Sequence, residues 1–161
     1  MIKPVPTSHG QPLGRVLSLA PNRRLHSIGL RMYEKVTRGI RVSVVPKYLE
    51  DQLTPVESYY YWSYTIEIVN EGKEPVQLKT RHWRITDASG RTEEVCGDGV
   101  VGKTPRLEPG EAFSYTSGCP LRTSSGLMVG SYAFTRSNGE VFEVAIPAFS
   151  LDSPYGKPRL N

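Results

Sequence analysis

Residues 59–70 read Tyr-Tyr-Tyr-Trp-Ser-Tyr-Thr-Ile-Glu-Ile-Val-Asn and carry the clearest structural pattern in the chain. Large apolar side chains occupy every second position, at Tyr60, Trp62, Tyr64, Ile66 and Ile68. A period of two residues places them on one face of a β-strand, because successive side chains of a strand point to opposite faces. The stretch therefore predicts a long strand that covers a hydrophobic core with one face.

Shorter segments with the same character lie on both sides of this strand. Turn residues separate them, as in Glu71–Pro75, Asp87–Gly90 and Ser137–Gly139. The predicted additional strands run from near Thr37 to Pro46 and over residues 76–86, 91–96, 112–117, 128–135, 141–146 and 149–151. We expect Gly118-Cys119-Pro120 to end the strand before it. Regular short strands without sustained helical periodicity predict an all-β sandwich or barrel.

The segment 76–86 contains a break in its alternation. Val76 and Leu78 share one face, whereas Trp83 and Ile85 share the other. A slip of one residue reverses the direction of every later side chain, so we expect a β-bulge or a change of sheet near Thr80–His82.

Composition limits the class of protein. The chain has 161 residues, 38% of them hydrophobic, which suits one domain with its own core. The apolar runs are too short to span a membrane. The two cysteines, Cys96 and Cys119, lack metal-ligand spacing and are interpreted as reduced thiols of a cytoplasmic protein.

Positive charge is concentrated at the N-terminal end. Residues 1–32 are rich in arginine, proline and glycine and show no regular period, which predicts a flexible, disordered basic extension. The dense Lys/Arg clusters of a nucleic-acid arm are missing, so no specific nucleic-acid binding is expected. Residues 33–153 are predicted to form the folded domain and 154–161 a C-terminal tail.

A glycine-rich stretch, Gly97–Thr104, fits both GxGxxG and the P-loop pattern GxxxxGK[ST]. A P-loop must follow a buried strand and begin a helix, whereas here acidic residues precede it and Pro109-Gly110 follows it closely. Two interpretations remain. The loop forms an anion-binding nest from Gly97, Gly99, Gly102 and Lys103, or its glycines only permit a tight crossover.

Other candidate chemistry is sparse. His82, Asp98 and the pair Glu93–Glu94 could contact Mg²⁺ or Co²⁺, but no spacing fixes a ligand set, so neither a metal site nor a cofactor is predicted. No nucleophile, base and acid are arranged as a catalytic set, and Cys119 is interpreted as a packing thiol. The sequence therefore predicts no catalytic residues and a protein that is not an enzyme.

Several stretches resemble the ApaG-domain family. They are Tyr64–Ile68, Arg81–Asp87, Gly99–Gly102, Leu107–Glu111, Tyr115–Leu121, Gly130–Tyr132 and Ile146–Leu151. The resemblance implies a fibronectin type III/immunoglobulin-like β-sandwich of about seven or eight antiparallel strands. It also implies a link to cobalt and magnesium tolerance or efflux, which would be indirect, and a protein-binding role in eukaryotic relatives. It supplies no catalytic residues.

The outward-facing tyrosines supply the functional hypothesis. Alternation turns Tyr59 and Tyr61 away from the core, and exposed aromatic side chains on a sheet are typical of interaction surfaces. We predict a non-enzymatic binding module with an unidentified protein partner, for which a homodimer is one option. The alternative is a binder of phosphate, nucleotide or a divalent metal at Gly97–Lys103.

Overall fold

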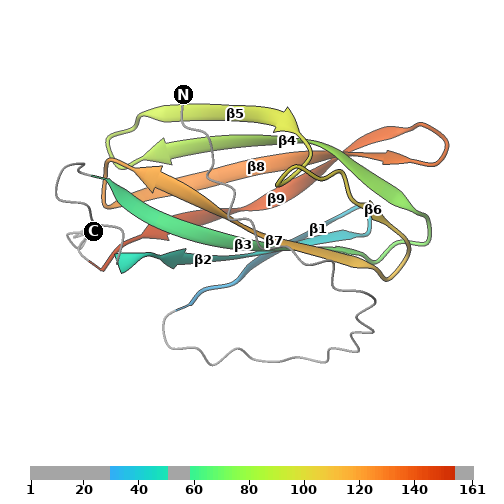
Figure 1. Ribbon diagram of the computed structural model, residues 1–161, viewed down its shortest axis with the longest axis horizontal. Coiled ribbons are helices and arrows are strands. Elements are labelled where there is room, and N and C mark those ends of the chain that lie inside the picture. Colours follow the sequence, from blue (N-terminus) through green and yellow to red (C-terminus); the bar gives the residue numbers. More distant parts are fainter. Residues whose placement is uncertain (1–29, 51–58, 155–161) are drawn as a thin grey trace.

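A computed structural model describes residues 30–50 and 59–154, which contain nine β-strands and no α-helix (Figure 1). The strands are β1 (Tyr33–Thr37), β2 (Ile40–Tyr48), β3 (Tyr60–Asn70), β4 (Val76–Asp87), β5 (Thr92–Asp98), β6 (Arg106–Leu107), β7 (Ala112–Leu121), β8 (Ser125–Arg136) and β9 (Val141–Asp152). They form two antiparallel sheets, which confirms the predicted all-β sandwich.

Sheet A has the order β1-β2-β3-β7, and sheet B has the order β5-β4-β8-β9 with the short β6 also paired to β4. On one side the two sheets are joined. The Tyr33 hydroxyl bonds to the Ser150 hydroxyl at 3.0 Å, and the Ala145 amide donates to the Thr37 hydroxyl at 3.3 Å. On the other side the edges are β7 and β5, and the described residues show no pairing between them.

The core lies between the sheets and follows the predicted alternation of β3. Trp62, Tyr64, Ile66 and Ile68 are each at most 5% exposed. The Trp62 indole donates to the Asp152 carbonyl at 3.0 Å, so the central strand is anchored to the end of β9. Facing side chains from sheet B include Leu78, Trp83, Met128, Tyr132, Phe134, Val144, Phe149 and Leu151.

The predicted irregularity in β4 is present, but it lies slightly earlier than expected. The register between β4 and β8 shifts between Leu78 and Thr80, so Lys79 is the extra residue. Val76 and Leu78 are buried before the shift, and Trp83 is buried after it. The Lys79 carbonyl accepts a hydrogen bond from the Gly99 amide at 2.8 Å, which ties the bulge to the glycine-rich turn.

Two predicted strand ends are wrong for the same reason. β2 continues through Pro46 to Tyr48, and β7 continues through Gly118-Cys119-Pro120 to Leu121. Proline cannot donate to a neighbouring strand, so it is tolerated where that neighbour is missing. β1 begins opposite Val44, so in the described residues it does not reach Pro46, and β7 is the edge of its sheet.

The number of strands also differs from the predicted seven or eight. β1 was not predicted, because its exposed, charged Glu34 and Lys35 hide the alternation. β6 has two residues, too few for a period, and residues 149–151 belong to the long β9 rather than to a separate strand.

The predicted extension and tail lie mostly outside the described residues, at 1–29 and 155–161. β1 begins at Tyr33 and β9 ends at Asp152, so the described strands fall within 33–153. Among the described residues no helix is long and apolar enough to cross a membrane.

Candidate functional site

The glycine-rich stretch forms a tight turn at the end of β5. Val100 and Lys103 exchange backbone hydrogen bonds of 2.8 and 2.9 Å, and Val101 and Gly102 form the tip with φ angles of 45° and 76°. Positive φ at both tip positions is the signature of a two-residue type I′ turn. Gly99 also has positive φ, and an added Cβ there would lie 2.3 Å from the Lys103 carbonyl oxygen.

The turn directs its carbonyl groups toward Arg81. The guanidinium of this half-buried side chain donates to the carbonyls of Asp98 and Gly99 at 2.9 and 2.8 Å. It also lies against Gly97, where an added Cβ would meet the guanidinium nitrogens at 3.0–3.1 Å. Gly97 and Gly99 therefore make room for the arginine and for the close turn.

This geometry bears on the anion-nest hypothesis. A nest needs free, convergent amides, but the amides of Gly99, Val100 and Lys103 already donate to backbone carbonyls. The carbonyls of Asp98 and Gly99 face a cation instead. No helix follows Lys103 in the described residues 59–154, so the P-loop pattern lacks the element that would hold phosphate. The turn is arranged to hold Arg81.

Tyr59 and Tyr61 lie where the alternation of β3 predicts, half-buried and turned away from Trp62. Their ring centroids are 6.3 Å apart. The Arg122 guanidinium lies over the Tyr59 ring at 5.1 Å, in the geometry of a cation–π contact. The sequence did not single out Arg122, because nothing local shows that the residue after β7 returns to the start of β3.

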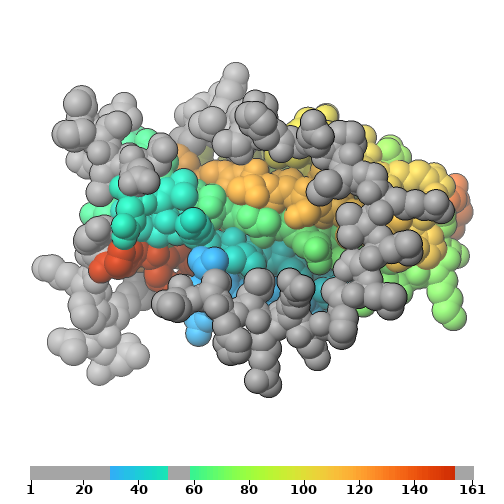
Figure 2. All heavy atoms as spheres, turned by 60° about the horizontal axis from the view of Figure 1, so that its bottom comes forward, coloured from blue at the N-terminus to red at the C-terminus, as the bar shows by residue number. Residues whose placement is uncertain are grey.

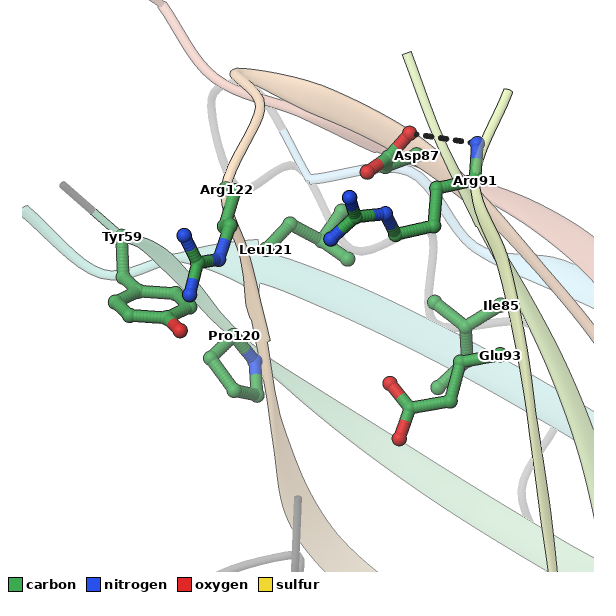
Figure 3. Close-up of a pocket in the computed structure, with 8 residues that line it drawn as sticks. All are labelled: Tyr59, Ile85, Asp87, Arg91, Glu93, Pro120, Leu121 and Arg122. Atoms are coloured by element: carbon green, nitrogen blue, oxygen red, sulfur yellow. Dashed lines mark hydrogen bonds between the residues drawn. The ribbon is translucent and has the colours of Figure 1, made fainter. Parts of the chain in front are cut away.

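Tyr59 and Arg122 form one wall of a pocket of about 110 Å³ on the open side of the sandwich (Figure 3). Arg91 extends from the opposite wall toward Leu121 and Arg122. The lining combines an aromatic ring, apolar side chains and charges of both signs, contributed by Tyr59, Ile85, Asp87, Arg91, Glu93, Pro120, Leu121 and Arg122. Tyrosine and arginine around an apolar floor are typical of the centres of protein interfaces.

One acid of the pocket is fixed by its own turn. Asp87 accepts hydrogen bonds from the Ser89 hydroxyl at 2.6 Å and from the amides of Ser89 and Arg91 at 2.9 and 3.0 Å. The bond from the Ser89 hydroxyl has the largest effect and, with the two amide bonds, lowers the pKa of Asp87 against the opposing effect of burial. The Asp87 carboxylate is therefore held in place as part of the pocket wall.

Deeper between the sheets lies a group of buried tyrosines. Tyr115 and Tyr132 are joined through their hydroxyls. Burial raises the pKa of Tyr64 to about 12, and it also raises the pKa values of Tyr115 and Tyr132. Burial likewise raises the pKa of the Cys119 thiol to about 12. These groups are therefore protonated and neutral at physiological pH. A neutral thiol suits a packing role for Cys119, because a nucleophilic cysteine acts as the thiolate.

The residues considered for metal binding are divided between two faces of sheet B, because His82 and Glu94 lie on the outer face and Glu93 lines the Tyr59 pocket. His82 pairs with Cys96 across the strands, and its Nε2 is 3.5 Å from a Glu94 carboxylate oxygen. Within residues 30–50 and 59–154, no three histidine, cysteine or acidic side chains are grouped so that they could hold a metal ion.

These features define a class: a two-sheet antiparallel β-sandwich with one closed side, one open side and a pocket of interface-like composition at the open side. Comparison with known proteins identifies the family. The sequence profile of the ApaG domain matches residues 50–136. The chain belongs to the ApaG domain family.

The relatives share sequence as well as fold. Protein ApaG of Rhodospirillum centenum is 61% identical over 130 residues, 81% of this chain and all of the relative. Protein ApaG of Brucella anthropi is 58% identical over the same shares of the two chains. The crystal structure of the putative ApaA protein from Bordetella pertussis is 48% identical, with a TM-score of 0.69 over 73% of this chain and 95% of the other.

Proposed function

We propose that the chain is a non-enzymatic ApaG-type module that binds a protein partner at the Tyr59 pocket. The observation that carries the proposal is the Arg122–Tyr59 pair at 5.1 Å on the rim of a pocket with an apolar floor. An arginine held over a tyrosine presents a planar donor and an apolar ring in a fixed geometry, so little side-chain entropy is lost on binding. Tyr61 extends the same surface.

The charged side chains of the pocket indicate which chemical groups the partner would carry. Arg91 and Arg122 offer guanidinium groups from opposite walls, and Glu93 lies below them. Because Asp87 is bonded within its turn, the arginines are the more available charges. A partner segment with one apolar side chain flanked by a carboxylate would fit both the floor and the rim. Any role in cobalt or magnesium tolerance would then be indirect, through this partner.

The test is quantitative affinity capture from cytoplasmic extract with the wild-type chain, Tyr59→Ala and Arg122→Ala. The matched control is Arg84→Ala, which removes an exposed arginine from the outer face of sheet B. Removing one interface anchor costs about 2 kcal/mol, so the partner should fall by about 30-fold with either pocket variant and stay with the control. Equal recovery with all four proteins would refute the proposal.

The competing hypothesis remains a small ligand at Gly97–Lys103. Its support is the exposed Lys103 beside the turn, but three amides there are already bonded. Isothermal calorimetry with phosphate, ATP, Mg²⁺ and Co²⁺ distinguishes the two. Saturable heat that Lys103→Ala abolishes would support the small-ligand hypothesis, and that result would not depend on Tyr59.

A further inference from the structure

The edges of the two sheets differ in how they are protected against strand addition. β5 carries Glu93, Glu94 and Asp98, and charged side chains are a common device that keeps an edge from pairing with another chain. β1 and β9 contact each other on the closed side. β7 has neither protection: its ten residues, Ala112–Leu121, include no charged side chain, and in the described part of the chain it pairs with β3 alone.

Backbone hydrogen bonds show which groups of β7 are unpaired. The Leu49 amide donates to the Tyr61 carbonyl, so Tyr61 bonds toward β2 and its neighbour Trp62 toward β7. The Asn70 amide donates to the Glu111 carbonyl, so Asn70, like Trp62, bonds toward β7. Hence Tyr115, Ser117 and Cys119 bond to β3, and the residues between them point their backbone groups outward. The outward residues are Ala112, Ser114, Thr116, Gly118 and Pro120.

The outward backbone amides and carbonyls of β7 can pair with those of a second copy of the strand. When two copies of β7 run antiparallel about a two-fold axis at Thr116, Thr116 pairs with Thr116, Ser114 with Gly118, and Ala112 with Pro120. Each outward amide then meets a carbonyl, and Pro120, which has no amide, lies opposite the end of the strand. The outward side chains are small, and Thr116 already bonds to Thr65 at 2.9 Å, so a threonine row would continue across the axis.

The charges at the two ends of β7 fit the same arrangement. Glu111 precedes the strand and Arg122 follows it, and both are exposed. In the antiparallel pair, Arg122 of one copy lies next to Gly110 and Glu111 of the other, at both ends of the interface. A parallel pair would instead place like charges together. Figure 2 shows β7 (orange) along the described surface beside β3 (green).

We propose that β7 is a self-association edge, through which two copies of this chain join their A sheets antiparallel about Thr116. Arg122 belongs both to this interface and to the Tyr59 pocket, whereas Thr116 does not line the pocket, so Thr116→Lys tests self-association apart from the proposed partner. The two Tyr59 and Tyr61 surfaces would lie on one continuous sheet face, so a dimeric module would present its binding surface twice.

Sedimentation equilibrium of the full chain, up to about 0.5 mM, tests the proposal, since weak dimers are populated in that range. The wild-type protein should be dimeric. Thr116→Lys places two lysines opposite each other at the axis and should yield monomer. Thr65→Lys is the matched control: it changes the neighbouring exposed threonine, which is not at the edge, and should leave the dimer intact.

Charge reversal tests the register and does not disturb the core. Glu111→Arg and Arg122→Glu should each weaken the dimer by about tenfold, because the symmetry applies every change twice. The double variant should restore wild-type association. A monomeric wild type, a dimer indifferent to Thr116→Lys, or a double variant no better than the single ones would overturn the proposal.

Discussion

Replacement of Gly99 by alanine is the sharpest test of how the glycine-rich turn works. The added Cβ would lie 2.3 Å from the Lys103 carbonyl oxygen, and φ at this residue is +62°. The backbone of the turn must therefore open. Opening breaks the two Val100–Lys103 bonds and the bond from Gly99 to Lys79, of 2.8–2.9 Å.

The magnitude follows from these losses. Each backbone bond contributes about 1 kcal/mol net, and positive φ costs a residue with a Cβ about 1 kcal/mol. Gly99→Ala should therefore lower the free energy of unfolding by about 4 kcal/mol. Gly102→Ala and Gly90→Ala meet open space at φ +76° and +87°, so each should cost only about 1 kcal/mol. Gly97→Ala displaces the Arg81 guanidinium from its two bonds to the turn carbonyls and should cost about 2 kcal/mol.

Urea denaturation followed by tryptophan fluorescence measures the series, with the slope checked for two-state behaviour. Gly90 is the matched control, since it lies in another turn and tests the φ cost alone. If Gly99→Ala lowered the free energy of unfolding no more than Gly90→Ala does, the turn would not be closed as described. Phosphate that stabilised the wild type but none of the glycine variants would favour the nest instead.

Three further outcomes are expected. Val101, a β-branched residue at φ 45°, should gain about 1 kcal/mol of stability on replacement by asparagine, as a higher melting temperature would show. Exposed Cys96 should react with a thiol reagent at pH 8 in the native state, whereas Cys119 should react only on unfolding, because burial raises its pKa to about 12. The pKa of Asp87 in the folded protein lies below its ordinary 3.8, so the carboxylate stabilises the fold above pH 3.8, and this stabilisation is lost as pH falls through the folded pKa. Asp87→Asn should therefore reduce the loss of stability at acid pH in a plot of unfolding free energy against pH.

The fold was predictable where side chains alternate without interruption. Trp62, Tyr64 and Ile66 alternate with polar residues, and the two-residue period alone identifies the inner face of β3. Even the slip in β4 was detectable, because buried Leu78 and buried Trp83 cannot share a face without an extra residue between them. These are local signals, and local signals suffice for a strand and its direction.

Prolines were misread because their effect depends on neighbours in space. Pro46 and Pro120 look like strand ends in the sequence, yet each lies in a strand. Whether a missing amide matters depends on whether a strand stands on that side, and sheet order decides this. The correct inference runs the other way: proline inside a strand indicates that its amide side faces an edge.

The pocket could not be predicted for a similar reason. Tyr59 was identified from alternation, but its contact with Arg122 joins residues far apart in the chain. Arg81 is named in the sequence analysis only as the start of the family-like stretch Arg81–Asp87, although its half-buried guanidinium explains why Gly97 lacks a side chain. In each case the residue type is visible in the sequence, and its partner appears only when the two sheets are assembled.

The same reasoning links Pro120 to the proposed self-association. A ten-residue edge strand without charge is ordinarily an aggregation hazard, because it can extend indefinitely by adding strands. Pairing two β7 strands about Thr116 consumes both edges at once, so the assembly closes at two copies. Pro120 has no amide, and in the Thr116 register it lies opposite Ala112 at the end of the strand, whereas a shift toward the C-terminal end would set it opposite a carbonyl inside the strand and leave that carbonyl unpaired. The feature that misled strand prediction would thus disfavour these shifted registers, while the two-fold pairing limits the edge to one partner.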